Sequence, residues 1–363
     1  MMNNRVDVHD GWLRVTFGDP GGGTADFHLR WLRHNCDVDR HPLTRERIAC
    51  SSELPDQLGA RSAAIEGDAL VVTWAHDERT SRYALDWLRE HAYARDRAIV
   101  PPPSADPSRL EIALPGATLG ELAARALART NERGAAIVRR GPSATRPEDE
   151  TESILEAFAA TGLEVIGTHF GRIEDLRTDN TTNDNTDQLG YTDAAVDLHT
   201  DQPFLDRPPR WQLLQSIRAA DHGGENDVVD AQAAARHLRS VDAEAYAILT
   251  GTPVVFHRRQ AAFERTVVSP VLEEAGDAVR VRFSYFTMAP HRVPFERMES
   301  FYRAYDRFSR LVRDPRHRTR FTLAPGDFLL YDNRRMLHGR TAFRGARWLR
   351  GVYFDRPATA SAA

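Results

Sequence analysis

The chain has 363 residues, with 41% hydrophobic and 28% charged residues and a formal net charge of −4. These values are typical of a soluble protein with one large domain and a smaller one. They give no reason to expect nucleic acid or a membrane surface as a partner. The 48 basic residues are all arginines, which excludes P-loop, pyridoxal-phosphate and Schiff-base enzymes, because these classes need a lysine.

The first hundred residues contain short apolar stretches broken by Gly and Asp turns, for example at Asp10–Gly11. This pattern predicts a small all-β domain over residues 1–98, closed by a helix over 84–95. Three consecutive prolines at 101–103 cannot continue a helix. They predict a linker over residues 99–114.

Residues 115–363 are predicted to form the second, larger domain. Apolar residues at three- and four-residue spacing predict helices over 117–130 and 148–162, and a further helix is expected over 295–312. Runs with strand character lie at 134–140, 211–217, 252–259, 278–285, 321–333 and 348–355. Many short strands without a regular strand–helix alternation predict an antiparallel sandwich or jelly roll rather than a doubly wound sheet.

A candidate metal site begins in "DLHTDQPF", residues 197–204. Residues two apart in an extended segment point to the same face, so His199 and Asp201 are able to bind one metal ion together. This spacing alone is a weak signal, but His338 follows the apolar strand in "GDFLLYDNRRMLHGR". Two histidines and one carboxylate occupy one face of an octahedral Fe(II) and leave three positions for co-substrate and oxygen.

An arginine near the end of the chain suits a dicarboxylate co-substrate. Arg347, in "GARWLRGVYFD", follows His338 in the chain, and a guanidinium binds a carboxylate through two parallel hydrogen bonds. Arg340 and Arg350 are close competitors. On a strand Arg350 would face away from Arg347, because an odd number of positions separates them, so we favour Arg347.

The order of HTD, GGEN, LHGR and RWLRGVY along nearly the whole chain resembles the γ-butyrobetaine and trimethyllysine hydroxylase branch of the Fe(II)/2-oxoglutarate dioxygenases. The wider group includes taurine and 2,4-D dioxygenases. The resemblance implies a jelly-roll (double-stranded β-helix) catalytic domain after the small all-β domain. It implies that His199, Asp201 and His338 bind iron and that Arg347 pairs with the C5 carboxylate of 2-oxoglutarate. Asn226 falls where the family places a hydroxyl residue beside that carboxylate, and an amide also donates hydrogen bonds.

The resemblance also implies the reaction. A C–H bond of a small molecule is hydroxylated while 2-oxoglutarate and O2 are consumed and succinate and CO2 are released, with ascorbate as a stimulant. Halogenation is excluded, because a halogenase needs a small residue in place of Asp201 to open a halide position.

The substrate pocket departs from the family pattern. Tyr191 and Tyr353 match two positions of the aromatic box that holds trimethylammonium groups by cation–π attraction, and Phe170 stands where the animal enzyme has tyrosine. Without the family context, such aromatics are more often core residues. Glu174 replaces the tryptophan of the fourth position and favours an amine that donates hydrogen bonds. Tyr285 and the serine before it replace an asparagine pair that holds the substrate carboxylate, so we expect a substrate other than γ-butyrobetaine.

In animal relatives the small domain binds zinc through three cysteines and a histidine. Cys36 and His41 are the candidates here, and two donors do not complete a tetrahedral site, so structural zinc is not expected. The resemblance further implies that the small domain packs near the catalytic entrance and that the protein is a homodimer. With only Cys36 and Cys50, a disulfide framework is not expected and a cytoplasmic location is.

Three functions remain open on this basis. The first is hydroxylation of a small amine or betaine-like molecule. The second is the same chemistry on another small acid, such as a phosphonate, a sulfonate or a specialised metabolite. The third is a non-catalytic binding protein, and the complete set of iron and co-substrate residues argues against it.

Overall fold

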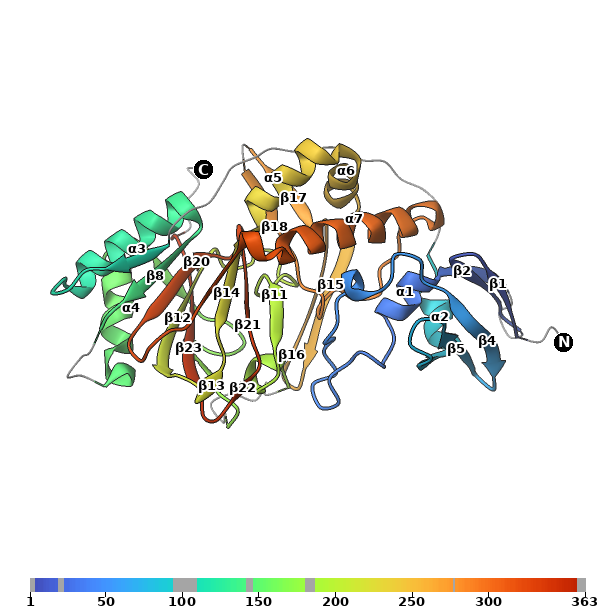
Figure 1. Ribbon diagram of the computed structural model, residues 1–363, viewed down its shortest axis with the longest axis horizontal. Helices are drawn as coiled ribbons and strands as arrows, with labels where there is room; N and C mark the ends of the chain where they lie inside the picture. The colour runs from blue at the N-terminus through green and yellow to red at the C-terminus, as the bar shows by residue number, and fades with distance from the viewer. Residues whose placement is uncertain are drawn as a thin grey trace, which may run out of the picture.

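A computed structural model describes residues 4–18, 23–93, 110–141, 146–179, 187–276 and 278–357. Figure 1 shows the elements of residues 4–93 gathered at one end of the long axis. Most of the predicted linker, residues 99–109, lies outside the described residues.

The first part of the chain forms two antiparallel three-stranded sheets and two short helices. The strands are β1 (Arg5–His9), β2 (Trp12–Thr16), β3 (Thr24–His28), β4 (Ala60–Glu66), β5 (Ala69–Trp74) and β6 (Thr80–Ala84). The helices are α1 (Leu29–His34) and α2 (Leu85–Glu90), the second within the range predicted for a closing helix. Gly11 adopts a φ of 77° in the first hairpin turn, a backbone conformation that glycine takes without strain.

Two facing sheets form the centre of the larger part of the chain (Figure 1). The first contains, in spatial order, β10 (Glu174–Leu176), β23 (Trp348–Asp355), β12 (Trp211–Arg218), β20 (Phe328–Asp332), β8 (Ala135–Arg139) and β7 (Glu111–Ala113), with β9 (Glu164–Ile166) paired to β23. The second contains β11 (Val196–His199), β21 (Met336–Arg340), β14 (Asn226–Asp230) and β19 (Arg318–Phe321). Their pairs are antiparallel except β7 with β8, so the predicted jelly roll is confirmed.

The alternation of side chains along these strands decides what each face contacts. On β12, Leu213 packs on the helix-covered face, whereas Leu214 packs between the two sheets. On β21, Met336 packs between the sheets and Leu337 packs outward. Because the side-chain period of a strand is two, His338 shares the inward face with Met336.

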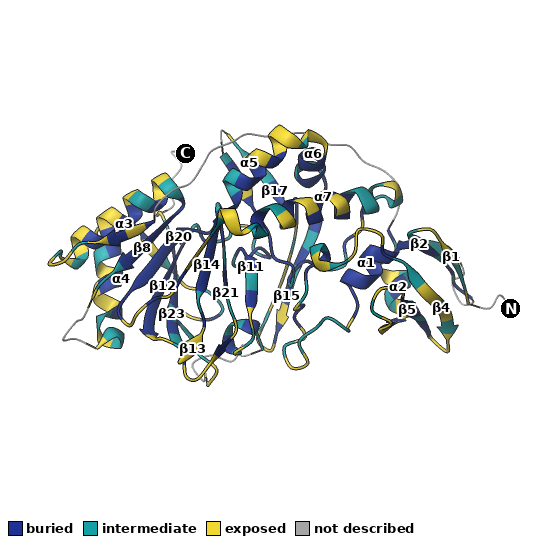
Figure 2. Cartoon of the chain, viewed as in Figure 1, coloured by how far each residue is buried: buried dark blue, intermediate teal, exposed yellow. Residues whose placement is uncertain are grey.

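Helices cover the outer faces of both sheets (Figure 2). On the first sheet they are α3 (Leu119–Arg133) and α4 (Thr151–Ala159), and on the second α5 (Ala231–Val241), α6 (Ala243–Gly251) and α7 (Phe295–Arg313). The predicted helices 117–130, 148–162 and 295–312 are present as α3, α4 and α7. The sequence analysis did not identify α5 and α6, which Asp230 and Asp242 cap through their side-chain oxygens.

Short two-stranded pairs complete the described fold: β13 (His222–Gly223) with β22 (Phe343–Arg344), β15 (Val254–Gln260) with β16 (Phe263–Ser269), and β17 (Leu272–Ala275) with β18 (Ala278–Val281). The run predicted as one strand over 278–285 is shorter in the structure. It leaves the strand after Val281 and turns, with the amide N of Met288 bonded to the carbonyl of Ser284. β7 lies within the range predicted for the linker and already belongs to the larger sheet.

The small domain and α7 share one buried core. Trp31 and Trp74 belong to the same apolar cluster as Phe301 and Phe308 of α7. A buried ion pair crosses this contact, with Arg30 Nη1 2.6 Å from Asp306 Oδ2 and both side chains at most 4% exposed.

We predict that Asp306→Ala lowers the free energy of unfolding by about 3–5 kcal/mol, because it leaves the Arg30 guanidinium buried without its counter-charge. Urea unfolding followed by fluorescence measures the change. Asp86→Ala is the control, since Asp86 is 95% exposed and pairs only with the neighbouring Arg89. Equal stability of the two variants would contradict a role of the Arg30–Asp306 pair in joining the domains.

Candidate active site

The pairing of β11 with β21 brings the predicted metal ligands together. His199 lies directly opposite His338 in this antiparallel pair, so the two imidazoles share one face. One ligand atom from each of His199, Asp201 and His338 lies within 4.8 Å of the others. His199 Nε2 is 3.2 Å from Asp201 Oδ1, and His338 Nε2 is 3.9 Å from Asp201 Oδ2.

Hydrogen bonds leave the Nε2 atom of each histidine to face the metal position. His199 Nδ1 lies 2.8 Å from the carbonyl of Asp197, which accepts only, so Nδ1 carries the proton. His338 Nδ1 lies 2.9 Å from the Tyr331 hydroxyl, which gives its own proton to Gln212, so Nδ1 again donates. Burial lowers the pKa of His338 to about 3, so its imidazole is neutral and its Nε2 lone pair is available.

Hydrogen bonds fix both the backbone and the side chain of the carboxylate ligand Asp201. The Asn333 side chain accepts from the Asp201 amide at 2.7 Å and donates to its carbonyl at 3.0 Å. The Tyr353 hydroxyl donates to Asp201 Oδ2 at 2.7 Å. Two imidazoles and one anchored carboxylate are the donor set that suits Fe(II) with open positions. The described residues contain no other group of three possible ligands within metal-binding distance.

Arg347 is a buried cation without a carboxylate partner among the described residues. It is 6% exposed, lines the cavity beside the metal ligands, and donates through Nη2 to Asn226 Oδ1 at 3.1 Å. Burial, with Arg340 nearby, lowers its pKa to about 9, so it stays protonated at neutral pH. The two competitors have other roles. Arg340 donates to the carbonyls of residues 189, 192 and 194, and Arg350 pairs with Asp175.

A cavity extends from the metal ligands between the two sheets. Three of the residues that the resemblance assigns to the substrate pocket, Phe170, Glu174 and Tyr353, line it. Tyr191 and Tyr285 do not line it. The Tyr191 hydroxyl donates to Glu174 Oε1 at 3.0 Å, and the Tyr285 hydroxyl accepts from the Asp197 amide at 3.2 Å. Tyr191 therefore acts on the cavity through Glu174, and Tyr285 supports the strand that carries His199.

Glu174 places a carboxylate in the cavity wall. It is 4% exposed, and its Oε1 accepts from Gln188 Nε2 at 2.7 Å and from Tyr191. Its Oε2 has no hydrogen-bond partner in the described part of the chain. Burial and the nearby Asp201 raise the pKa of Glu174 to about 7. The cavity therefore offers a carboxylate oxygen that is free to accept a hydrogen bond.

The sequence patterns did not indicate several further cavity residues, among them Glu46, Arg258, Gln202 and Thr287. Glu46, from the small domain, is 5% exposed and forms an ion pair with Arg258 of β15. No motif marks either residue, since they meet only through the packing of two distant segments. Gln202 and Thr287 also line the cavity. Gln202 follows the HTD triplet directly, which was the only available signal for it.

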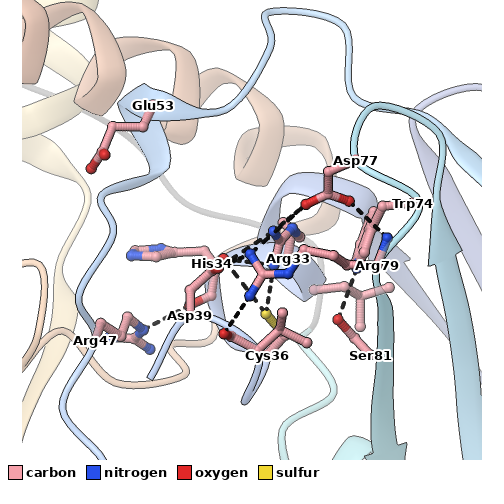
Figure 3. Close-up of polar contacts among 12 residues, drawn as sticks. Arg33, His34, Cys36, Asp39, Arg47, Glu53, Trp74, Asp77, Arg79 and Ser81 are labelled. Carbon is pink, nitrogen blue, oxygen red and sulfur yellow. Dashed lines mark hydrogen bonds and ion pairs between the residues drawn. The ribbon is translucent and has the colours of Figure 1, made fainter. Parts of the chain in front are cut away.

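Charged side chains surround Cys36, one of the two candidate zinc residues (Figure 3). The Arg33 guanidinium donates to Cys36 Sγ at 3.1 Å and pairs with Asp39 at 2.6 Å and Asp77 at 2.8 Å. The ring Nδ1 of His41 accepts from the Thr44 amide instead. A guanidinium thus already supplies positive charge beside Cys36, and these residues do not fit a closed tetrahedral zinc site.

Comparison with known proteins agrees with this geometry. Residues 95–353 match the family described as "Taurine catabolism dioxygenase TauD, TfdA family". The chain is 30% identical to the gamma-butyrobetaine dioxygenase of Pseudomonas sp. (strain AK-1), over 95% of this chain and 91% of that one. It is 27% identical to the trimethyllysine dioxygenase of Meyerozyma guilliermondii, over 93% of this chain and 89% of that one.

A crystal structure of the non-heme iron oxygenase OrfP with Fe and alpha-ketoglutaric acid superposes with a TM-score of 0.49 and 23% identity. It covers 65% of this chain and 82% of that one. The chain belongs to the TauD/TfdA family of dioxygenases. The protein is an iron- and 2-oxoglutarate-dependent dioxygenase that acts on a small molecule. Among its described helices, none is both long and apolar enough to span a membrane.

We predict that Asn333→Ala weakens Fe(II) binding about 10–100-fold, because the backbone of Asp201 loses both hydrogen bonds that fix it. Anaerobic competition with a metal chelator measures the affinity. Asn131→Ala, at an exposed position of α3, is the matched control. Wild-type affinity in Asn333→Ala would show that Asn333 does not position the ligand.

Proposed function

We propose that this protein hydroxylates an unactivated C–H bond of a small amine, with conversion of 2-oxoglutarate and O2 to succinate and CO2. The observation that carries the proposal is one cavity lined by the His199–Asp201–His338 group, the unpaired cation of Arg347 and the free carboxylate oxygen of Glu174. The two histidines and Asp201 would hold Fe(II), and Arg347 would hold 2-oxoglutarate. Glu174 would face the substrate.

Arg347 and Asn226 suit the far carboxylate of 2-oxoglutarate. A buried guanidinium gains most from an anionic partner, because few water molecules compete for its donors. Asn226 Oδ1 accepts from Arg347. This contact holds the guanidinium and leaves the amide Nδ2 to donate to the co-substrate.

Iron and 2-oxoglutarate together supply the oxidising chemistry, in which one oxygen atom of O2 goes to the substrate and one to succinate. The protein itself contributes position and exclusion of water. Tyr353 and Asn333 hold the carboxylate ligand, and the two Nδ1 hydrogen bonds orient the imidazoles. Phe286 lines the cavity and packs edge-on against His199, with 5.0 Å between the ring centroids.

The wall around Glu174 favours an amine over an acid at this end of the cavity. Its free Oε2 is an acceptor, and Phe170 lies beside it in the wall. The cation of Arg258 also lines the cavity, and Glu46 already pairs with it. A phosphonate or sulfonate would therefore meet an uncompensated carboxylate in place of a free guanidinium. A homodimeric state stays a prediction from the sequence resemblance, and a cytoplasmic location stays a prediction from the presence of only two cysteines.

The direct test is succinate formation from 2-oxoglutarate with Fe(II) and ascorbate, across a panel of amines, betaines, phosphonates and sulfonates. We expect an amine to stimulate turnover, and His199→Ala to abolish it. Arg347→Met should raise the KM for 2-oxoglutarate at least tenfold, because the far carboxylate loses its charge-assisted bonds. No succinate above the His199→Ala background, with iron bound, would favour a binding protein instead.

We predict a pH dependence of amine binding that Glu174 sets. With a pKa raised to about 7, its carboxyl group becomes ionised as the pH rises through neutrality, and an ammonium group binds the ionised form. The KM for the amine should therefore fall between about pH 6 and pH 8 and then level off. Glu174→Gln should remove this dependence, whereas Glu152→Gln, at an exposed position of α4, should retain it. The same pH profile in Glu174→Gln would exclude Glu174 as the titrating group.

A further inference from the structure

Two buried polar side chains in the cavity wall lack hydrogen-bond partners among the described residues. Gln202 is 4% exposed, and both its Oε1 and its Nε2 are unpaired. Thr287 is 2% exposed, and its Oγ1 is unpaired. Burying a polar group without a hydrogen-bond partner is unfavourable, so two such residues in one cavity point to a ligand that supplies the missing hydrogen bonds.

The backbone of Gln202 supports a functional role. It is one of three described non-glycine residues with positive φ, at 54°. This left-handed conformation is uncommon for glutamine and carries a conformational cost that occurs preferentially at ligand sites. Its carbonyl accepts from the Leu205 amide at 3.1 Å, which closes a tight turn after the metal ligand Asp201. The turn holds the side-chain amide of Gln202 in the cavity wall, next to the metal ligand Asp201.

In Thr287, the side-chain hydroxyl is the polar group that lacks a hydrogen-bond partner among the described residues. The Thr287 amide donates to the Ser284 carbonyl at 3.3 Å, and its carbonyl accepts from the His257 amide at 2.9 Å. Both backbone groups are therefore satisfied, whereas Oγ1 is not. Phe286, the preceding residue, lies against His199, which puts the Thr287 segment beside the metal ligands as well.

We propose that Gln202 Nε2 and Thr287 Oγ1 donate hydrogen bonds to a planar acceptor group of the substrate, a carboxylate or an amide carbonyl, while Glu174 accepts from its ammonium group. The substrate is then an amino acid or its amide, and the amine carries N–H donors. This proposal rests on the proposed function and deepens it.

The hydrogen-bonding groups of the cavity wall support this assignment of the acceptor group to Gln202 and Thr287 and of the ammonium group to Glu174. Gln202 and Thr287 are neutral and both carry donor hydrogens, which suits an acceptor without adding charge beside Asp201. Glu174 Oε2 offers only lone pairs when ionised, which suits an N–H donor. A quaternary ammonium has no such hydrogen and would leave that oxygen unpaired, whereas a primary or secondary ammonium satisfies it.

The test uses the full-length protein with Fe(II) and 2-oxoglutarate under anaerobic conditions, and measures ligand affinity by calorimetry. The probes are matched sets that differ only in the acceptor group: lysine, lysine amide and pentane-1,5-diamine, and the corresponding set from ornithine. We expect the acid or the amide to bind at least tenfold more tightly than the diamine of the same length.

Two variants assign the difference to the proposed residues. Thr287→Val keeps the shape and removes the donor, and Gln202→Met keeps the length and removes the amide. Each variant should reduce the preference for the acid or amide over the diamine about tenfold or more, without changing the affinity for 2-oxoglutarate. Thr266→Val, at an exposed position of β16, should leave both unchanged.

The outcomes separate this proposal from the proposed function. With 2-oxoglutarate still bound, three results would each overturn the proposal. They are equal binding of all members of a set, no binding of any acid or amide, and a preference for the acid or amide that survives both variants. Failure to bind 2-oxoglutarate in the wild-type protein would overturn the proposed function and this proposal with it.

Discussion

The antiparallel register between β11 and β21 is the constraint on which the active site depends. It sets His199 opposite His338, and a slip of one residue would turn His338 toward the outer helices. The close approach of the two strands needs a glycine, because a Cβ at Gly339 would lie 2.9 Å from the Val196 carbonyl oxygen. The hydrogen bonds that the two Nδ1 atoms donate to the Asp197 carbonyl and the Tyr331 hydroxyl then leave the Nε2 atoms to face the metal.

The small domain takes part in the cavity as well as in the fold. Its Glu46 reaches the cavity wall and pairs with Arg258, and its carboxylate also accepts from the Leu189 amide. Leu189 follows Gln188, the residue that donates to Glu174. The ion pair, the 187–191 segment and the free carboxylate oxygen thus form one connected wall. A change in how the small domain packs would therefore alter the end of the cavity where we place the substrate amine.

The sequence allowed the metal ligands and Arg347 to be predicted because their chemistry is tied to short motifs in a fixed order. It also indicated Glu174, as a departure from that pattern. It did not indicate Glu46, Arg258 or Thr287, because these residues reach the cavity only through contacts between distant segments. Tyr285 stands where relatives have one of an asparagine pair; it does not line the described cavity, and its hydroxyl accepts from the Asp197 backbone amide. The helix α6 was not recognised because its apolar residues do not gather on one face, whereas α5 is amphipathic and its periodicity was present in the sequence but not recognised.

An anaerobic titration of the Fe(II)-loaded protein with 2-oxoglutarate, followed by the charge-transfer absorption of the chelate, shows whether the three ligands and Arg347 form one iron and co-substrate site. We expect saturable binding of one 2-oxoglutarate per iron in the wild-type protein, loss of the signal in His338→Ala and a weaker affinity in Arg347→Met. If the wild-type protein binds iron through these residues but gives no charge-transfer signal with 2-oxoglutarate, the site does not bind the co-substrate and the proposed function is wrong.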